Sequence, residues 1–278
     1  SSVDGDKWES VALINVLKPK RRLYKPTFSV TSNGLLMIAA HGAIPWGNAD
    51  ASQPDSPPGQ LAMCWISKDG HTWSEPTPIT GATGYAVNHV VWNRETAFAV
   101  ARGESCGNYA INLYSGREGK DFTRLFGCNL GNESQPGTLA LIFDGDQMHC
   151  LMSRYNSGEI SGTQTRFPWS TGLLGTAKGP RFDEWEWKQI NESIAHAKLL
   201  RLPDQRIIAI AGLTDPEYRT SLCELNLATR KLSEFLTLPK EWHNVSLAHH
   251  DGQLWLSYHE SHSVKDTVHL AKVKLDLK

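Results

Sequence analysis

The chain has little net charge, no long apolar run and no helical pattern. Its 28 Lys and Arg against 29 Asp and Glu give a formal net charge of −1 over 278 residues. A charge this close to zero disfavours a nucleic-acid or membrane-surface partner, and no apolar run is as long as a membrane span. No 3.6-residue amphipathic repeat extends over the length of a helix. We therefore expect an all-β protein with neither kind of partner.

Cysteine is also scarce, with five residues in the whole chain. An odd number this small is too few for a disulfide scaffold. Three of them lie inside apolar runs, where cysteine acts as a small buried hydrophobe; these are Cys64, Cys150 and Cys223. The other two, Cys106 and Cys128, flank an expected hairpin and could pair in an oxidising compartment.

The sequence gives only weak signals for the cellular compartment, the cofactor and the oligomeric state. No signal peptide is visible, but the Ser1-Ser2 start is compatible with a processed end, so periplasmic location or secretion stays open. The pair His249-His250 resembles a metal-binding pair, yet adjacent residues of a strand point to opposite faces. We expect no metal ion, no organic cofactor and a monomer.

One short segment, Ser67–Trp73 with the sequence SKDGHTW, has the composition of a tight turn. Asp69 and Gly70 suit the turn, since Asp bonds nearby backbone amides and Gly tolerates positive φ. Ser67 and Thr72 can add side-chain bonds to the backbone, and Trp73 can fold back over the hairpin with its large apolar ring. We interpret Asp69 as a turn residue and not as a catalyst.

Hairpin patterns recur along the chain, each with two apolar strands around a polar turn. They cover residues 28–40, 90–101, 139–152, 199–211 and 246–258. Four of their turns contain Asp-Gly, Asn-Gly or Pro-Asp and the turn of the second contains Asn93-Arg94-Glu95, all of which suit a hairpin. Four-stranded units that recur about every 50–60 residues are typical of propeller blades. The sequence predicts a single five-bladed β-propeller over residues 1–278.

The fifth unit has no fourth strand of its own before the chain ends. The segment Val11–Val16 follows Trp8 and resembles the missing aromatic-bearing strand. We expect it to pair with a strand near Val268–Leu277, because this closure would leave no open sheet edge.

Propeller geometry then sorts the polar residues. The loops that join strand 4 to the next strand 1, and strand 2 to strand 3, lie at one face, the top, and the other turns lie at the bottom. The candidates at the top are Glu133, His41, His89, His243 and His259 as catalytic groups, and Arg154, Arg219, Tyr218, Arg102 and Trp242 as substrate-binding groups. Any one of them is more often ion-paired or structural than catalytic. Together they suit a pocket for an anionic sugar, because guanidinium groups bind carboxylates through two parallel hydrogen bonds.

The S-x-D-G-x-T-W pattern resembles the Asp-box of sialidase-like β-propellers. Other segments resemble a bacterial BNR-repeat, glycoside-hydrolase-type group of that family: Asn132-Glu133-Ser134, 172–178, 185–188, 200–204, 219–223, 250–252 and 256–258. The resemblance implies a propeller whose Asp-box lies on the face away from the active site. It also implies that Glu133 is a general acid/base or nucleophile activator and that Arg154 and Arg219 hold a substrate carboxylate.

The chain departs from that group at two places. Asn244 stands where the group has a Tyr, and Ala40-His41-Gly42 stands where it has an Arg-Glu pair. A full sialidase set is therefore absent, and the histidine candidates could replace the missing groups in proton transfer. The leading hypothesis is a carbohydrate-active enzyme of glycoside-hydrolase type acting on an acidic glycan or glycoside. A polysaccharide lyase and a non-catalytic glycan-binding propeller are the alternatives.

Overall fold

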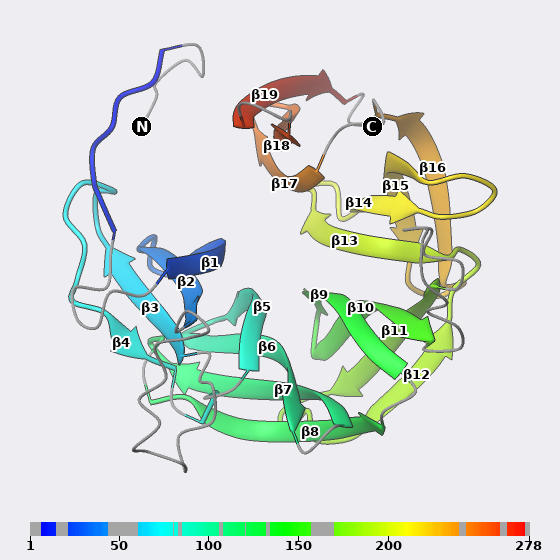
Figure 1. Ribbon diagram of the computed structural model, residues 1–278, viewed down its shortest axis with the longest axis horizontal. Helices are drawn as coiled ribbons and strands as arrows, with labels where there is room; N and C mark the ends of the chain where they lie inside the picture. The colour runs from blue at the N-terminus through cyan, green and yellow to red at the C-terminus, as the bar shows by residue number, and fades with distance from the viewer. Residues whose placement is uncertain are drawn as a thin grey trace. The chain divides into compact units, whose positions relative to one another are not determined.

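The computed structural model describes residues 7–14, 22–43, 61–79, 81–82, 85–105, 108–119, 121–131, 134–156, 170–238, 243–261 and 266–275. Across these ranges the protein is all-β, with 19 strands in five antiparallel sheets and no helix (Figure 1). The same ranges therefore contain no helix that could span a membrane. The chain divides into two compact units, which are residues 1–132 with 181–183, and residues 133–180 with 184–278.

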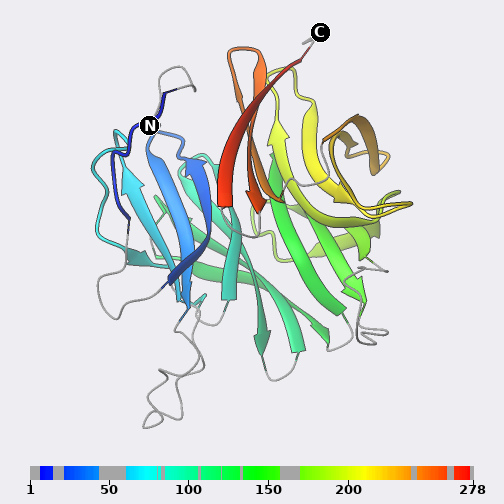
Figure 2. The same ribbon diagram turned by 45° about the horizontal axis from the view of Figure 1, so that its top comes forward.

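The first unit contains two four-stranded sheets. The first sheet consists of β1 (Arg22–Val30), β2 (Leu36–Ala43), β3 (Leu61–Ser67) and β4 (Thr77–Pro78), and the second of β5 (Tyr85–Asn93), β6 (Thr96–Ser105), β7 (Asn108–Arg117) and β8 (Thr123–Gly131). Each strand pairs with its neighbour in sequence, as the side-by-side strands of the first sheet show in Figure 2.

The second unit contains three sheets of the same kind. They consist of β9 (Ser134–Asp144), β10 (Gln147–Asn156), β11 (Ser170–Lys178) and β12 (Trp185–Gln189); β13 (Ile194–Arg201), β14 (Ile207–Leu213), β15 (Arg219–Asn226) and β16 (Lys231–Thr237); and β17 (His243–His250), β18 (Gln253–Ser261) and β19 (Asp266–Lys274). Strand order again follows the sequence within each sheet.

The five predicted hairpins are confirmed as β1/β2, β5/β6, β9/β10, β13/β14 and β17/β18. Their turns have the expected chemistry: Gly145 and Gly252 adopt φ of +59° and +70°, which side chains rarely allow. Five consecutive meanders of this kind are the blades of a five-bladed β-propeller, so the predicted fold class is confirmed. That the whole chain is one domain stays a prediction.

The predicted closing strand is not formed in the part of the chain that the structure describes. Residues 7–14 contain no strand, residues 15–16 lie outside the described ranges, and β17–β19 form a three-stranded sheet. Leu13 is 87% exposed, whereas Ile14 packs against Met63 and Trp65 of the first sheet. A short apolar run does not make a strand unless a sheet edge supplies its hydrogen bonds.

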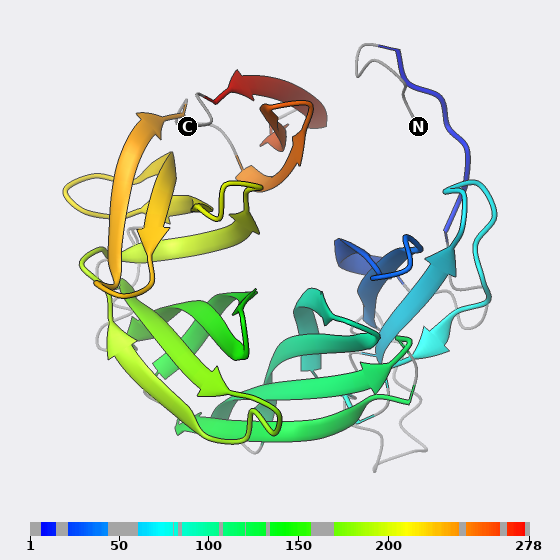
Figure 3. The same ribbon diagram turned by 180° about the vertical axis from the view of Figure 1, so that it is seen from behind.

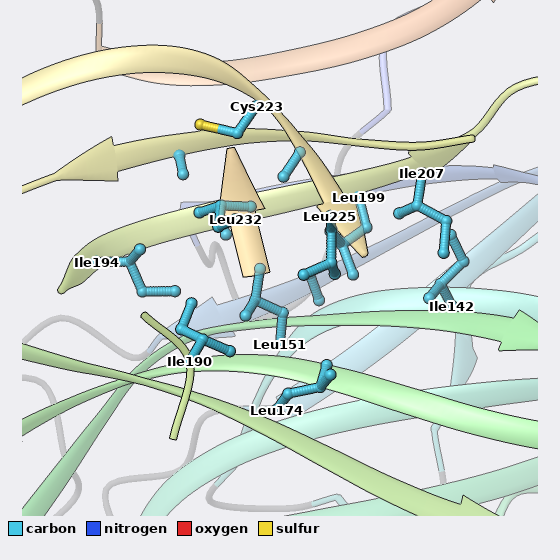
Figure 4. Packing of buried hydrophobic residues seen from close by; sticks show 14 of the residues in the cluster. Ile142, Leu151, Leu174, Ile190, Ile194, Leu199, Ile207, Cys223, Leu225 and Leu232 are labelled. Atoms are coloured by element: carbon cyan, nitrogen blue, oxygen red, sulfur yellow. The ribbon is translucent and has the colours of Figure 1, made fainter. Parts of the chain in front are cut away.

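The largest core of the second unit lies between the third and fourth sheets (Figure 4). Leu151 and Leu174 of the third sheet pack there with Ile194, Cys223 and Leu232. All seven residues of β14 are buried, as expected for a continuous apolar run in a central strand.

The predicted burial of Cys64, Cys150 and Cys223 is confirmed. Burial raises the pKa of the Cys64 thiol to about 11 and that of Cys223 to about 12, so both stay protonated and poorly nucleophilic. The suggested Cys106–Cys128 pair involves Cys106, which lies outside the described residues.

The turn after β3 has the hydrogen bonds that its residue types predict. The backbone amides of His71 and Thr72 each donate to Asp69 at 2.8 Å, and that of Gly70 donates to Ser67 Oγ at 2.8 Å. The hydrogen bonds from the backbone amides of Thr72 and His71 lower the pKa of Asp69, which keeps the carboxylate ionised. Asp69 therefore serves the turn.

Trp73 folds back over this turn. Its Nε1 donates to the Gly70 carbonyl at 3.0 Å, and its ring meets Phe28 edge-on at 6.5 Å between centroids. The ring also packs against the small cluster that contains Met63 and Trp65. Trp73 is half-buried and not largely buried as expected, because the turn covers one side of the ring and leaves part of it in solvent.

Candidate functional site

The end of β10 lies against the start of β13 in the second unit. The hydroxyl groups of Ser153 and Tyr155 both donate to the Ala195 carbonyl, Ser153 at 2.9 Å. Ser153 Oγ also accepts the Thr138 amide at 3.0 Å. A Cβ on Gly137 would lie 1.9 Å from Ser153 Oγ, so only glycine allows this contact. Ser153 and Tyr155 thus hold β10 to β13.

Ala195 and His196 lie in an irregularity of β13, where the register with β14 shifts between Ile194 and Ala197. The His196 ring covers Gly212, whose missing Cβ would lie 2.5 Å from Cε1 of the ring. Its Nδ1 is 3.4 Å from the Tyr218 hydroxyl. Burial raises the pKa of Tyr218, which makes its hydroxyl a poor nucleophile at neutral pH.

Arg219 projects from the face of the fourth sheet opposite to His196, since successive strand residues alternate between the two faces. Its Nε and Nη2 lie 3.1 Å and 2.8 Å from Glu234 Oε2, and its Nη1 donates to the Asp215 carbonyl at 2.7 Å. The hydroxyls of Ser221 and Thr237 donate to Glu234 Oε1 at 2.6 Å and 2.7 Å. The guanidinium predicted to bind a substrate carboxylate is therefore occupied by a carboxylate of the chain itself.

These contacts stabilise the charged forms of both Glu234 and Arg219. Hydrogen bonds from Arg219 and Ser221 lower the pKa of Glu234 to about 2, and the bond to Glu234 raises the pKa of Arg219. Both groups thus stay charged across the physiological pH range.

Glu192, in the loop between β12 and β13, has the opposite environment. Its Oε1 accepts a 2.8 Å bond from Asn191 Nδ2, and Asn191 is itself bonded to the backbone of Leu232. Burial raises the pKa of Glu192, and Arg219 offsets only part of this effect. Sequence reasoning did not select Glu192. Its position between two strands offered no local signal, because burial of that loop depends on β16.

The Arg219–Glu234 pair should make stability depend on pH. The pKa of Glu234 is lower in the folded protein than its ordinary 4.5, so the stabilisation is present above that value and is lost as the pH falls toward about 2. We expect Glu234→Gln to lower the urea midpoint at about pH 7, and the difference from wild type to shrink below about pH 4.

Glu224→Gln, on the exposed side of β15, is the matched control and should leave the midpoint nearly unchanged. A difference between wild type and Glu234→Gln that stays constant across this pH range would contradict the ion pair.

The other predicted residues fall into three groups. His41, His89 and Arg102 lie on β2, β5 and β6 of the first unit, with His41 5% exposed. His243 and His259 are register partners across β17 and β18, so the fold brings their backbones together. Glu133 and Trp242 lie outside the described residues.

Arg154 is half-buried near the end of β10 and faces away from the Ala195 contact made by its neighbours. Convergence of the ten predicted residues on one pocket stays a prediction. In the described ranges, no group of three or more His, Cys, Asp or Glu side chains could hold a metal ion.

No protein-family model and no curated protein matches this sequence. Among solved structures, a protein of unknown function from Dyadobacter fermentans has a TM-score of 0.76 at 12% identity, over 99% of this chain and 82% of that one. The family GH93 α-L-arabinofuranosidase of Fusarium graminearum, in complex with arabinobiose, has a TM-score of 0.61 at 11% identity, over 92% and 81%.

An endo-arabinase from Bacteroides thetaiotaomicron has a TM-score of 0.56 at 14% identity, over 92% of this chain and 95% of that one. At these identities the likeness shows the fold, which this chain shares with glycoside hydrolases. The sialidase-like relationship suggested by the Asp-box pattern stays a prediction.

Proposed function

We propose that the protein is a carbohydrate-active enzyme of glycoside-hydrolase type that cleaves an acidic glycan or glycoside. Two of the similar solved structures are an arabinofuranosidase and an endo-arabinase, which supports a carbohydrate substrate. The acidic character of the substrate rests on the arginine candidates of the sequence, of which Arg219 is paired with Glu234, whereas Arg102 and Arg154 are not paired with that carboxylate.

The observation that carries the proposal is the half-buried carboxyl group of Glu192 beside the Arg219–Glu234 ion pair. Glycoside hydrolysis needs one carboxyl group that keeps its proton and one that is ionised. Burial favours the protonated form of Glu192. Glu234 is ionised but accepts bonds from Arg219, Ser221 and Thr237, which leaves it to position Arg219 rather than to react.

In this mechanism Glu192 is the general acid and Glu133 is the partner carboxylate. The glycosidic C–O bond breaks as the Glu192 proton moves to the departing oxygen. Water adds to the anomeric carbon after Glu133 accepts its proton. Arg154 binds the carboxylate of the substrate, because a guanidinium group matches a carboxylate with two parallel bonds.

A glycan-library assay with acidic and neutral polysaccharides tests this proposal. New reducing ends without unsaturated uronates are the expected products. Unsaturated uronates would instead indicate a lyase, and retention of a glycan without any product would indicate a non-catalytic binding propeller.

A further inference from the structure

A groove of about 650 Å³ lies beside the outermost strand of the fourth sheet. It is lined by residues from the β15–β16 hairpin and from the end of β19, elements that lie near one another in Figures 1 and 3. Its volume is in the usual range for a site that binds a small molecule or part of a chain molecule. Of its lining residues only Glu234 has a part in the proposed mechanism, where it positions Arg219.

A β-bulge places two large apolar side chains in this groove. Leu222 is paired with Leu236 and Cys223 with Glu234, so that Phe235 is the extra residue of β16. A bulge redirects the side chains around it. Phe235 is 47% exposed and Leu236 is 38% exposed, and both line the groove.

The bulge is held in place from beneath. Glu234, the residue before Phe235, is bound by Arg219, Ser221 and Thr237 at 2.6–2.8 Å. Three side chains thus fix Glu234 and, with it, the backbone that carries the exposed ring. An aromatic ring kept in solvent on a fixed backbone is preorganised for a ligand, because little freedom remains to be lost on binding.

The charges of the groove favour an anion. Arg206 is paired with Asp204 at 2.8 Å and Glu234 with Arg219, so these two charges are matched within the chain. The remaining charged groups of the lining are Lys231 and Lys274 against Glu224. Two ammonium groups against one carboxylate leave an excess of positive charge around the Phe235 ring.

We propose that this groove binds an acidic oligosaccharide, as a second carbohydrate site outside the catalytic residues. The apolar face of one sugar ring packs on Phe235, and a carboxylate of a neighbouring sugar lies near Lys274. Hydroxyl and amide groups of the lining, such as Ser233 and Asn226, serve the sugar hydroxyls. The inference rests on the proposed carbohydrate substrate and extends it to glycan capture.

Native gel electrophoresis with polygalacturonate in the gel tests the proposal. Polygalacturonate in the gel should slow the migration of the wild-type protein, whereas neutral arabinan should hardly change it. Added salt should weaken the retardation by polygalacturonate. Phe235→Ala and Lys274→Ala should each weaken the retardation about tenfold, a change of about 1.4 kcal/mol. Both residues are at the surface, so both variants should keep the wild-type urea midpoint.

Phe28→Ala and Lys178→Ala are the matched controls, because both residues are exposed and lie on other sheets. They should be slowed like wild type. The proposed binding site would be refuted if polygalacturonate did not slow the wild-type protein. It would also be refuted if polygalacturonate slowed Phe235→Ala as much as wild type. If Phe235→Ala loses the retardation but the wild-type protein hydrolyses no glycan, the groove is a glycan-binding site and the proposed hydrolase activity is refuted.

Discussion

Glu192→Gln should lower the turnover of a glycoside with a poor leaving group by about 10²–10⁴-fold, the usual contribution of a general acid. Glutamine has nearly the same shape and keeps an acceptor for the Asn191 amide, but it has no proton to give. The measurement is kcat for a natural oligosaccharide and for an aryl glycoside. The kcat for the aryl glycoside should fall much less, because its leaving group departs without protonation.

This dependence on the leaving group separates a proton donor from a structural residue. Damage to the fold would slow both substrates equally. Glu184→Gln is the matched control, since Glu184 is exposed and only eight positions away in the sequence. Equal losses on the two substrates in Glu192→Gln would contradict its role as the acid.

The pH profile gives an independent check of the same group. A general acid works in its protonated form, so activity should fall on the alkaline side of the profile as the pH rises through the pKa of Glu192. Burial raises that pKa, which extends activity toward neutral pH. The fall on the alkaline side should be absent from the residual activity of Glu192→Gln.

Trp73→Ala should lower the free energy of unfolding by about 3 kcal/mol, the lower end of the usual cost of removing a packed tryptophan. The lower end applies because the ring is only half-buried. The substitution removes the contacts with Phe28 and with the cluster of Met63 and Trp65, together with the bond to the Gly70 carbonyl. Urea unfolding of purified protein measures the change.

Trp8→Ala is the control, because Trp8 is 63% exposed and its removal should change the unfolding free energy by less than about 0.5 kcal/mol. Folded Trp73→Ala should keep its activity per molecule, because the residue serves its own hairpin. A stable variant that has lost turnover would mean that the Ser67–Trp73 turn belongs to the active site.

The repeated hairpins could be predicted from the sequence because their causes are local. Alternating apolar residues and an Asp-Gly or Pro-Asp turn determine a hairpin wherever they occur, and β9/β10 and β17/β18 formed where expected. The turn after β3 was equally predictable, since Ser67, Asp69 and Gly70 bond within seven residues. Burial of Cys150 and Cys223 followed from their apolar surroundings.

The partners of charged groups were decided by the tertiary structure. Arg219 and Glu234 are 15 residues apart and meet only because β15 and β16 pair in one register, which no residue between them specifies. The same pairing creates the bulge that exposes Phe235. Glu192 acquires its raised pKa from burial, and Asn191 beside it is held by Leu232 of a distant strand. Long-range pairing sets burial and ion-pair geometry, and these determine which carboxyl group keeps its proton.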